Sequence, residues 1–587
     1  MNLRSMGLGA MAILAAILAL GACQTAEPEV VEKVVEVVKE VEVEKEVVKE
    51  VEVVKEVEVE KEVVKEVEVV KEVEAKLSPA MALEAARYGG DLKVVAQASI
   101  KSLDCDFTGA YVCGSVHLHY QEGLLAYDDD FNPRPQLIDD WSVSGDGMTY
   151  TLTLREGPTF HGRGDFESRP ITSDDSIASF GRWMKRHAAG KSLSRVLADP
   201  GFSKVDDRVF EVNLKQPYGA LISHLGMLRG RNIQWPEEIA VMEPTEDVGV
   251  DNYIGTGPFE LENWEVGNRV ILKRYEDYVP RSDPHSNFAG AQIPYVDRII
   301  WLEIPSEETK IAGLKTGEWD IVDGASLDYF PEMEAHPEIG VALDKPGKAS
   351  QLGINHSKWP TSEKKFRQGI QYAMNTAEYM AALGPEELWT LCATAFHCGT
   401  PLESHEGDDR YNQNNLELAK QLIEESGYNG EPLIHMNPND YGTITPLGPV
   451  FKKQMEAVGV NIELPGMDWA TLISRIGDLD YWHFFSTWGG FYGIHDPITD
   501  GSVNGSSRTG FYNDRMVELS EHYAAAMDPK EKAKIVSEIE DIWWDEVPSL
   551  LIGQFFLTTP YRDWVKNFTV IKGMPNYNSV WIEGRDQ

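Results

Sequence analysis

Two segments in the first half of the chain alternate between apolar and polar side chains. Thr149–Leu154 has the sequence TYTLTL, and Val209–Leu214 has the sequence VFEVNL. A period of two places every second side chain on one face of an extended strand, where a core can bury it. We therefore predict a half-buried β-strand at each segment.

Other segments have the helical spacing of apolar residues, with clear end signals. One helix is predicted between Ser306, which can cap its start, and Gly317, which can end it. Further helices are predicted through 366–374, from Asn415, through 450–455 and from Asp528. Strand patterns occur between helices at Trp319–Val322, Val460–Leu464 and Tyr481–Thr487. This alternation predicts an α/β fold in which helices flank a sheet.

The chain begins with an apolar segment that is typical of an export signal. Arg4 supplies a positive charge, and Met6–Leu20 is uncharged but shorter than a membrane-spanning helix needs. The next residues, Gly21-Ala22-Cys23, resemble a bacterial lipobox, in which the cysteine becomes the lipid-bearing first residue of the mature protein. We predict a signal peptide over residues 1–23 and lipidation of Cys23. An ordinary secretory peptide is the alternative.

Residues 24–87 precede the globular part and have low complexity. Between 30 and 76 only valine, glutamate and lysine occur, apart from Ala75, and residues 41–56 recur unchanged as 57–72. Glutamate and lysine three and four apart favour a helix, whereas valine favours a strand. We predict a stalk or linker that separates the body from the lipid anchor, either as a helical spacer or as a solvated tail.

The composition of the chain limits its partners. It has 587 residues, and 95 Asp and Glu against 54 Lys and Arg give a net charge of −41. The part from about Tyr88 onward exceeds the usual size of one domain, so several lobes are expected. An acidic surface repels phosphate groups, which argues against nucleic-acid binding and against charge-driven adhesion to anionic lipid.

Four cysteines remain besides Cys23, and they are Cys105, Cys113, Cys392 and Cys398. An even number in an exported chain suggests disulfides. The short spacings favour the pairs Cys105–Cys113 and Cys392–Cys398. A zinc site is the alternative, but no Cys-x-x-Cys spacing supports it.

The body contains none of the enzyme signatures that we sought. Gly-x-Ser-x-Gly, His-Glu-x-x-His and the P-loop pattern are absent. His117 and His119 would share one face of a strand, but surface histidines of strands are commoner than metal ligands. Asp128–Asp130 lack the EF-hand spacing, which favours a solvated loop. We predict no catalytic residue, no metal and no cofactor.

Several segments occur in an order that is typical of one known family. They are Gly90–Val94, Ser102-Leu103-Asp104, Pro135–Leu154, Phe160-His161-Gly162, Gly255–Leu261 with Trp264, Gly317–Ile321, Leu352–Asn355 and Glu546–Leu550. Together they resemble the bacterial extracellular solute-binding proteins of family five, the binding components of peptide- and nickel-type ABC importers. Cys105 replaces a proline of the family pattern.

The resemblance implies a periplasmic-binding-protein-like fold of type II, cluster C, with three lobes. Lobe I would combine 88–125, 253–347 and 549–587, lobe II would be 126–252, and lobe III would be 348–548. The chain would cross between lobes I and III near Leu352–Asn355 and near Pro548–Gly553. Two such crossings form a hinge, which lets the lobes close over a ligand.

The solute-binding residues are inferred from the same resemblance. In peptide-binding relatives, a Trp-x-x-Asp-x-x-Asp/Glu-Pro segment pairs its first Asp with the amino terminus of the peptide. Here Asp496-Pro497 matches, but Gly493 stands where the amine-binding Asp would be. The candidate ligand contacts are Trp488, Phe491, Tyr492, His495, Asp496, Asn355 and Asp104. Core packing is the alternative for Trp488 and Phe491, and a turn role is the alternative for Asp496.

These patterns predict a substrate-binding component of an ABC importer. It would be a monomer in the cell envelope, held by lipid to the outer face of the cytoplasmic membrane. It would capture a peptide, a sugar, an opine-like conjugate or another small polar solute between lobes I and III and deliver it to permease subunits with their ATPase. The alternative is an extracellular glycan hydrolase with a carboxylate pair in the same cleft. A structural or adhesive surface protein would have no small-molecule pocket.

Overall fold

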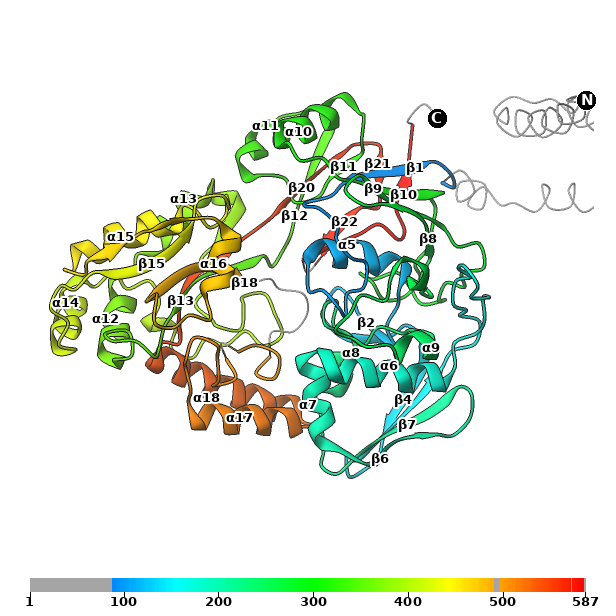
Figure 1. The fold of residues 1–587 in the computed structure, drawn as a ribbon, viewed down its shortest axis with the longest axis horizontal. Coiled ribbons are helices and arrows are strands. Elements are labelled where there is room, and N and C mark those ends of the chain that lie inside the picture. Colours follow the sequence, from blue (N-terminus) through cyan, green and yellow to red (C-terminus); the bar gives the residue numbers. More distant parts are fainter. Residues whose placement is uncertain (1–86, 490–495, 502, 572, 585–587) are drawn as a thin grey trace, which may run out of the picture. The chain divides into compact units, whose positions relative to one another are not determined.

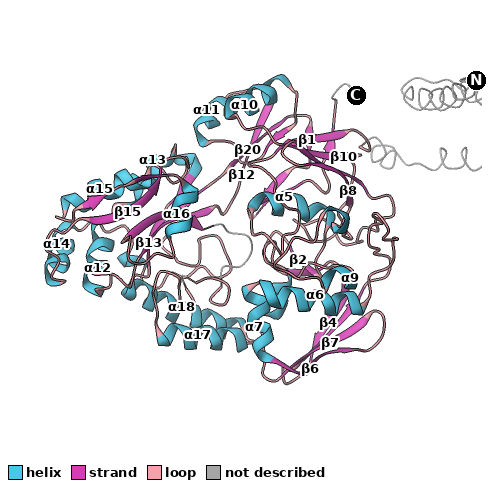
Figure 2. Cartoon of the chain, in the orientation of Figure 1, coloured by secondary structure: helices cyan, strands magenta, loops and turns pink. Residues whose placement is uncertain are grey.

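The computed structural model describes residues 87–489, 496–501, 503–571 and 573–584, which belong to the unit that runs from Arg87 to Gln587. The predicted signal peptide, Cys23 and residues 24–86 of the predicted stalk lie outside the described residues. Three main sheets organise this unit in a mixed α/β arrangement, as predicted (Figures 1 and 2). We call the part built on each sheet lobe I, lobe II or lobe III.

Lobe I contains a seven-stranded sheet with parallel strands at its centre. β1 (Asp91–Val95) pairs in parallel with β10 (Arg298–Leu302) on one side and with β11 (Ile321–Val322) on the other. The chain passes from β10 to β11 through α10 (Glu307–Thr316), so a topological switch point lies at the carboxyl end of β1. The other strands and helices are β12 (Ile339–Leu343), β20 (Thr558–Arg562), β9 (Arg269–Arg274), β8 (Phe259–Glu265), α5 (Tyr111–Tyr120) and α11 (Phe330–Glu334).

Lobe II contains a four-stranded antiparallel sheet in the order β4-β5-β7-β6. β5 (Thr149–Leu154) and β7 (Val209–Leu214) pair at its centre, and their alternating burial confirms both strand predictions. The remaining elements are β4 (Ile138–Val143), β6 (Leu197–Lys204), α6 (Ser173–Arg186), α7 (Ala188–Val196), α8 (Leu221–Leu225) and α9 (Glu237–Ala240).

Lobe III contains a second seven-stranded sheet. β13 (Lys348–Ile354) lies between β18 (Phe484–Gly489) and β19 (Ser549–Phe555) and is antiparallel to both. The other strands are β14 (Trp389–Thr390), β15 (Leu433–Pro438), β16 (Ile462–Glu463) and β17 (Gly466–Met467). The helices are α12 (Lys364–Ala373), α13 (Thr376–Leu383), α14 (Leu416–Glu425), α15 (Leu447–Ala457), α16 (Trp469–Arg475), α17 (Asp514–Ala525) and α18 (Pro529–Glu546).

Short strand pairs complete the described part of the fold. They are β2 (Leu125–Tyr127) with β3 (Pro133–Pro135), β21 (Val565–Lys566) with β24 (Trp581–Ile582), and β22 (Thr569–Ile571) with β23 (Met574–Asn576). Within the described ranges, no helix combines the length and the hydrophobicity that a membrane span requires.

The chain passes between lobe I and lobe III at two places. Residues 344–347 connect β12 to β13, and residues 556–557 connect β19 to β20. The backbone N–H of Asp344 donates to the carbonyl oxygen of Leu557 at 3.0 Å, so the two crossings lie side by side. This is the geometry of a double-stranded hinge.

The crossings differ in position from the sequence-based expectation. Leu352–Asn355 falls at the end of β13, and Pro548–Gly553 falls at the start of β19. The reason is that β19 pairs with β13 in lobe III, so the chain enters the sheet of lobe I only at β20. The last segment of lobe I was expected to start at residue 549. The observed crossing comes later in the chain by the length of β19, which is 7 residues.

The apolar cores divide the three lobes into two bodies. One continuous core joins Leu92 and Phe259 of lobe I to Leu152 and Trp235 of lobe II. Lobe III has a core of its own on its sheet, which extends to a few lobe I residues beside the crossings, and a second core under α17 and α18. Because one close-packed core resists internal sliding, we treat lobes I and II as one rigid body and lobe III as the other.

The predicted helix ends are confirmed at three helices. The Ser306 hydroxyl accepts a hydrogen bond from the backbone of α10, and Gly317 ends that helix with φ 76°. The side chains of Asn415 and Asp528 cap α14 and α18 in the same way. Local capping chemistry is therefore sufficient to locate these ends.

The strand predicted around His117 and His119 is wrong, because both residues lie on α5. Residues two apart on a helix point in different directions, so the two imidazoles share no face. Burial lowers the pKa of His119 to about 3, and its Nε2 accepts a hydrogen bond from the backbone N–H of Tyr577 at 3.0 Å. The alternation of apolar residues with histidine imitates a strand, but in this segment the histidines are themselves part of the core.

Candidate functional site

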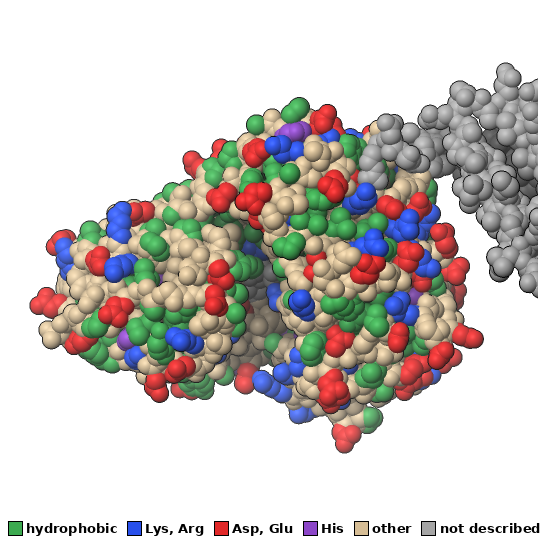
Figure 3. All heavy atoms as spheres, turned by 45° about the horizontal axis from the view of Figure 1, so that its top comes forward, with side chains coloured by type: hydrophobic (Ala, Val, Ile, Leu, Met, Phe, Trp, Pro, Cys, Tyr) green, Lys and Arg blue, Asp and Glu red, His purple; other side chains and the backbone are tan. Residues whose placement is uncertain are grey.

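A hollow lies between lobe III and the joined lobes I and II in the space-filling view (Figure 3). Towards the hinge, lobe I presents the carboxyl ends of the parallel strands β1 and β11. Ligands of open α/β sheets bind outside such strand ends at a topological switch point. The hollow between the two bodies is therefore the candidate site.

A group of four polar side chains lies at the hinge, and we call Tyr111, Asp323, Asp344 and Lys348 the hinge cluster. Nζ of Lys348 lies 2.6 Å from Oδ2 of Asp344, and both side chains are buried. The hydroxyl of Tyr111 donates to Oδ1 of Asp323 at 2.9 Å. Nζ of Lys348 also lies 6.0 Å from the centre of the Tyr111 ring. The cluster thus connects α5 and the end of β11 to the first crossing.

The charge of the hinge cluster depends on pH near neutrality. Burial raises the pKa of Asp323 to about 7, and the charge of Asp344 also raises it, against the hydrogen bond from Tyr111 and the charges of Lys348 and Lys310. Oδ2 of Asp323 is buried and has no hydrogen-bond partner among the described residues. Protonation of this carboxyl group removes the cost of an incompletely solvated charge.

Trp488 lies at the hinge end of the sheet in lobe III. It pairs in register with Ser350, two residues after the start of β13. Its ring packs near Tyr441 and Phe555, with centroid distances of 6.2 and 6.1 Å. The indole Nε1 is buried and lacks an acceptor among the described residues. Trp488 is only partly buried and packs against the edge of the lobe III core, and its contact with a solute stays a prediction.

Three of the other predicted ligand contacts, Phe491, Tyr492 and His495, lie outside the described residues. Their contact with a solute stays a prediction.

Asp104 and Asn355 are buried and hydrogen-bonded to protein groups. Oδ2 of Asp104 lies 2.7 Å from Nη2 of Arg182, and burial raises the pKa of this carboxyl group although the Arg182 charge opposes the shift. The side-chain amide of Asn355 donates to the carbonyl oxygens of Leu479 and Trp482 at 2.6 and 2.8 Å. Contact of Asp104 and Asn355 with a solute stays a prediction.

Asp496 has a turn role and also an unexpected partner. Its Oδ1 accepts hydrogen bonds from the backbone N–H groups of Ile498 and Thr499, as the turn interpretation predicts. Its Oδ2 accepts a hydrogen bond from Nε2 of His224 in lobe II at 2.6 Å. No local sequence pattern marks His224, because its partner is 272 residues away in the chain.

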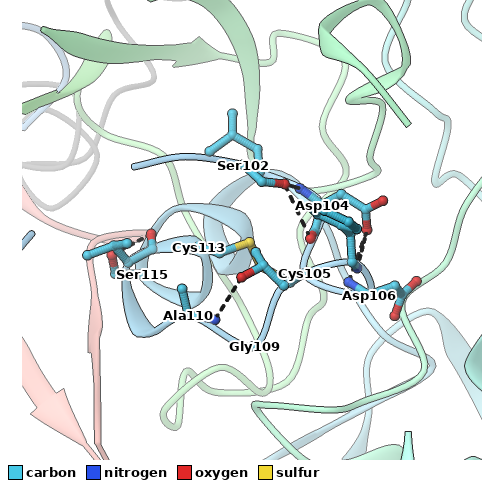
Figure 4. The surroundings of a disulfide bond; sticks show 12 residues. Ser102, Asp104, Cys105, Asp106, Gly109, Ala110, Cys113 and Ser115 are labelled. Carbon is cyan, nitrogen blue, oxygen red and sulfur yellow. Dashed lines mark hydrogen bonds between the residues drawn. A yellow bond between two sulfur atoms is a disulfide. The ribbon is translucent and has the colours of Figure 1, made fainter. Parts of the chain in front are cut away.

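The structure contains the disulfides Cys105–Cys113 and Cys392–Cys398, with Cα–Cα distances of 5.9 and 5.8 Å. Figure 4 shows the first, which joins the loop after Asp104 to the first turn of α5. It therefore restrains the helix that carries Tyr111 of the hinge cluster. Among the described residues no three His, Cys, Asp or Glu side chains form a metal-binding group.

Comparison with known proteins identifies the family. Residues 132–509 match the model of the bacterial extracellular solute-binding proteins, family 5. The chain belongs to this family. It is 30% identical over 470 residues to a probable peptide ABC transporter periplasmic-binding protein of Sinorhizobium fredii, which covers 77% of this chain and 86% of the relative. A glutathione-binding protein of Salmonella typhimurium is 22% identical, over 80% of this chain and 90% of the relative.

Solved structures have the same fold. The periplasmic binding protein DppA of Helicobacter pylori, in complex with the peptide STSA, superposes with a TM-score of 0.71 at 21% identity and covers 86% of this chain and 100% of its own. The binding protein AgaA of A. tumefaciens R10, in complex with agropinic acid, gives 0.70 at 21% identity and covers 85% and 99%. The predicted periplasmic-binding-protein-like fold is confirmed.

Membership of this family establishes the general activity of the protein. The protein is a solute-binding component of an ABC importer, and its relatives are periplasmic or extracellular binding proteins. Such a protein binds and releases its cargo without a chemical step, which agrees with a sequence that carries none of the enzyme signatures sought. These comparisons give no support to the glycan hydrolase alternative.

Proposed function

We propose that lobe III closes over a peptide or a similarly polar solute against the joined lobes I and II, and that the closed protein delivers this solute to a permease and its ATPase. The single observation that carries the proposal is the pair of adjacent crossings, where the backbone N–H of Asp344 donates to the carbonyl oxygen of Leu557. Two bodies that are joined by two adjacent crossings can turn about them.

A peptide is the favoured solute class. A relative at 30% identity is described as a probable peptide transporter component, and a structural relative holds a four-residue peptide. Trp488 supplies an aromatic face and an indole N–H without an acceptor, which together suit an amide group next to an apolar side chain. Gly493 in place of the amine-binding Asp leaves sugars and opine-like conjugates as other outcomes of the test.

The proposal includes attachment to the membrane. Cys23 would carry lipid, and residues 24–87 would hold the body away from the outer face of the cytoplasmic membrane. The protein would act there as a monomer.

Mass spectrometry of small molecules that co-purify with the full chain, carrying Cys23→Ser to keep it soluble, tests the solute class. We expect a peptide, and the identified compound is then used in titration calorimetry. Trp488→Ala should weaken its affinity at least tenfold, because a buried aromatic anchor contributes on the order of 2 kcal/mol.

The matched control is Trp359→Ala, since Trp359 is also in lobe III but is 43% exposed. The affinity of this variant for the identified compound should equal that of the parent protein. Equal affinity in the two variants would exclude Trp488 from the site. Breakdown products of a bound oligosaccharide, rather than the intact compound, would favour the hydrolase.

Metabolic labelling with a radioactive fatty acid tests the anchor. The wild-type chain should be labelled and remain with membranes, whereas Cys23→Ser should be unlabelled and soluble. Membrane retention of Cys23→Ser would contradict lipid attachment at this residue.

A further inference from the structure

Lobe II and lobe III are connected by a buried ion pair that lies away from the hinge. His224 is on α8 of lobe II, and Asp496 follows β18 in lobe III. The His224 Nε2 and the Asp496 Oδ2 are 2.6 Å apart, and the two side chains are 0% and 1% exposed. Burial raises the pKa of Asp496, but His224 and the two hydrogen bonds from Thr499 together lower it below its ordinary value, so the carboxylate form is favoured.

Each partner is held in place by its own lobe. Oδ1 of Asp496 accepts from the backbone of Ile498 and Thr499 at 3.0 and 2.9 Å. Nδ1 of His224 lies 3.1 Å from the hydroxyl of Tyr218, also in lobe II. Within this pair, Oδ2 of Asp496 and Nε2 of His224 are the two atoms that make the contact between the lobes. Partners that are oriented in advance lose little conformational freedom when they meet.

A second polar contact lies beside this pair. Nζ of Lys532, on α18, donates to the carbonyl oxygen of Gly219 in lobe II at 2.9 Å, and its charge also interacts with Asp496. Gly219 is packed so closely against the carbonyl group of Ala526 that a Cβ atom there would collide with it. Lobe III therefore approaches lobe II at a position where only glycine fits without displacement. Figure 1 shows α17 and α18 next to the α7–α8 region.

The ion pair is also close in sequence to the candidate site. Asp496 is seven residues after Gly489, the last residue of β18, and β18 ends beside the hinge next to Trp488. The carboxylate that meets lobe II is thus eight residues after Trp488 in the sequence.

We infer that His224 and Asp496, supported by Lys532, form a latch that holds lobe III against lobe II in the closed protein. Such a latch is specific because it needs one hydrogen-bond geometry, and it is reversible because both polar groups regain water when they separate. The inference rests on the proposed closure of the lobes, but not on the identity of the solute.

Distance measurements by double electron–electron resonance test the latch in the full chain. Spin labels on Val205→Cys in lobe II and Ile473→Cys in lobe III, which are 60% and 42% exposed, report lobe separation, with Cys23→Ser to avoid a third label. In the labelled protein without further substitutions, we expect a population of molecules with a short distance between the two spin labels. His224→Gln and Asp496→Asn should each reduce it roughly three- to tenfold, and the double variant should reduce it no further than one of them.

Two controls separate a latch from a structural role. His405→Gln removes a histidine that pairs with Asp408 inside lobe III and is 76% exposed on its side chain, so the distances should not change. Lys532→Met keeps the ion pair and should reduce the short-distance population by a smaller factor. Circular dichroism must show a folded protein in every variant used.

Unchanged distances in folded His224→Gln and Asp496→Asn would overturn the latch, and so would the absence of a short-distance population in the parent protein. Failure of the proposed function is seen separately, as the absence of any co-purifying solute. A variant that opens the lobes but still binds the solute supports the latch and leaves solute capture intact.

Discussion

Lobe II meets lobe I and lobe III through interfaces of different chemistry. With lobe I it shares one apolar core, inside which Arg182 of α6 pairs with Asp104 and Asp106. With lobe III it makes two polar contacts, from His224 to Asp496 and from Gly219 to Lys532, and a few apolar ones, since Ile498 and Ala524 pack against the edge of the shared core. Separating apolar surfaces exposes them to water at a cost proportional to their area, whereas separated polar groups are hydrated again. The comparison teaches that lobe II is joined to lobe I by a continuous core, whereas its contact with lobe III is small enough to be broken as the proposed latch requires.

The largest effect is expected from breaking the core that lobes I and II share. Trp235 is fully buried in it, and its Nε1 donates to Asp106 of lobe I at 2.9 Å. Trp235→Ala should lower the free energy of unfolding by about 4 kcal/mol, measured by urea titration. Trp359→Ala, at an exposed position of lobe III, is the control and should change it by less than about 0.5 kcal/mol. Equal losses would show that the core does not dominate stability.

The next effect concerns the charges inside that core. Arg182→Met leaves two buried carboxylates, Asp104 and Asp106, without their cation, and should cost about 3 kcal/mol in the same titration. Arg515→Met is the control, because Arg515 pairs with Glu518 and Glu538 in solvent, and its effect should be much smaller. If Arg182→Met left the free energy of unfolding unchanged, the ion pairs would be dispensable for the joint between lobes I and II.

The next effect depends on pH and concerns a buried carboxyl group of lobe III. Burial raises the pKa of Glu540 to about 8 from its ordinary value near 4.5. The folded state therefore holds a proton that the unfolded state releases, and the free energy of unfolding falls as pH rises from about 4.5 to 8.

Glu540→Gln should remove the part of this loss that Glu540 contributes, which is on the order of 2 kcal/mol between pH 5 and 8.5, while the part from Asp323 in lobe I remains. Urea midpoints at the two pH values measure it. Glu538→Gln, on the exposed side of the same helix, should keep the pH dependence of the parent. If the stability of Glu540→Gln depended on pH in the same way as that of the parent protein, Glu540 would not be uncharged in the folded state.

The smallest effect on stability is expected at the contact between lobes II and III. Gly219→Ala should force Ala526 away and lengthen the spin-label distances, while the free energy of unfolding changes by less than about 1 kcal/mol. Gly181→Ala on α6 has free space around the added methyl group and should leave the distances unchanged. A Gly219→Ala protein with the parent distances would show that the approach of the two lobes is not tight.

Local signals were sufficient for many elements of this fold. The strands at Thr149–Leu154 and Val209–Leu214 have the predicted bounds, because a period-two pattern needs no information from elsewhere in the chain. Helix starts at Ser306 and Asp528 are likewise determined by residues within one turn. The strand predicted at HLHY failed because a fully buried helix has no polar face to reveal its period.

The candidate site was much less predictable than the elements. Trp488 was found through a family resemblance, but the buried pairing of Asp344 with Lys348, and of Tyr111 with Asp323, depends on the packing of α5 against the hinge. The hinge itself was misplaced by a few residues because the partner of β19 cannot be read from its own sequence. Asp104 and Asn355 are conspicuous in the sequence, yet both have structural partners.

By itself, the sequence determined the α/β class, the acidic multi-lobed body, the helix caps and the family, since each depends on local pattern, composition or collinear motifs. Only the tertiary structure decided which lobes share a core, where the chain crosses between them, and that His224 meets Asp496. The physical reason is that burial and pairing between residues hundreds of positions apart arise from the packing of whole sheets, which leaves no mark on neighbouring residues in the chain.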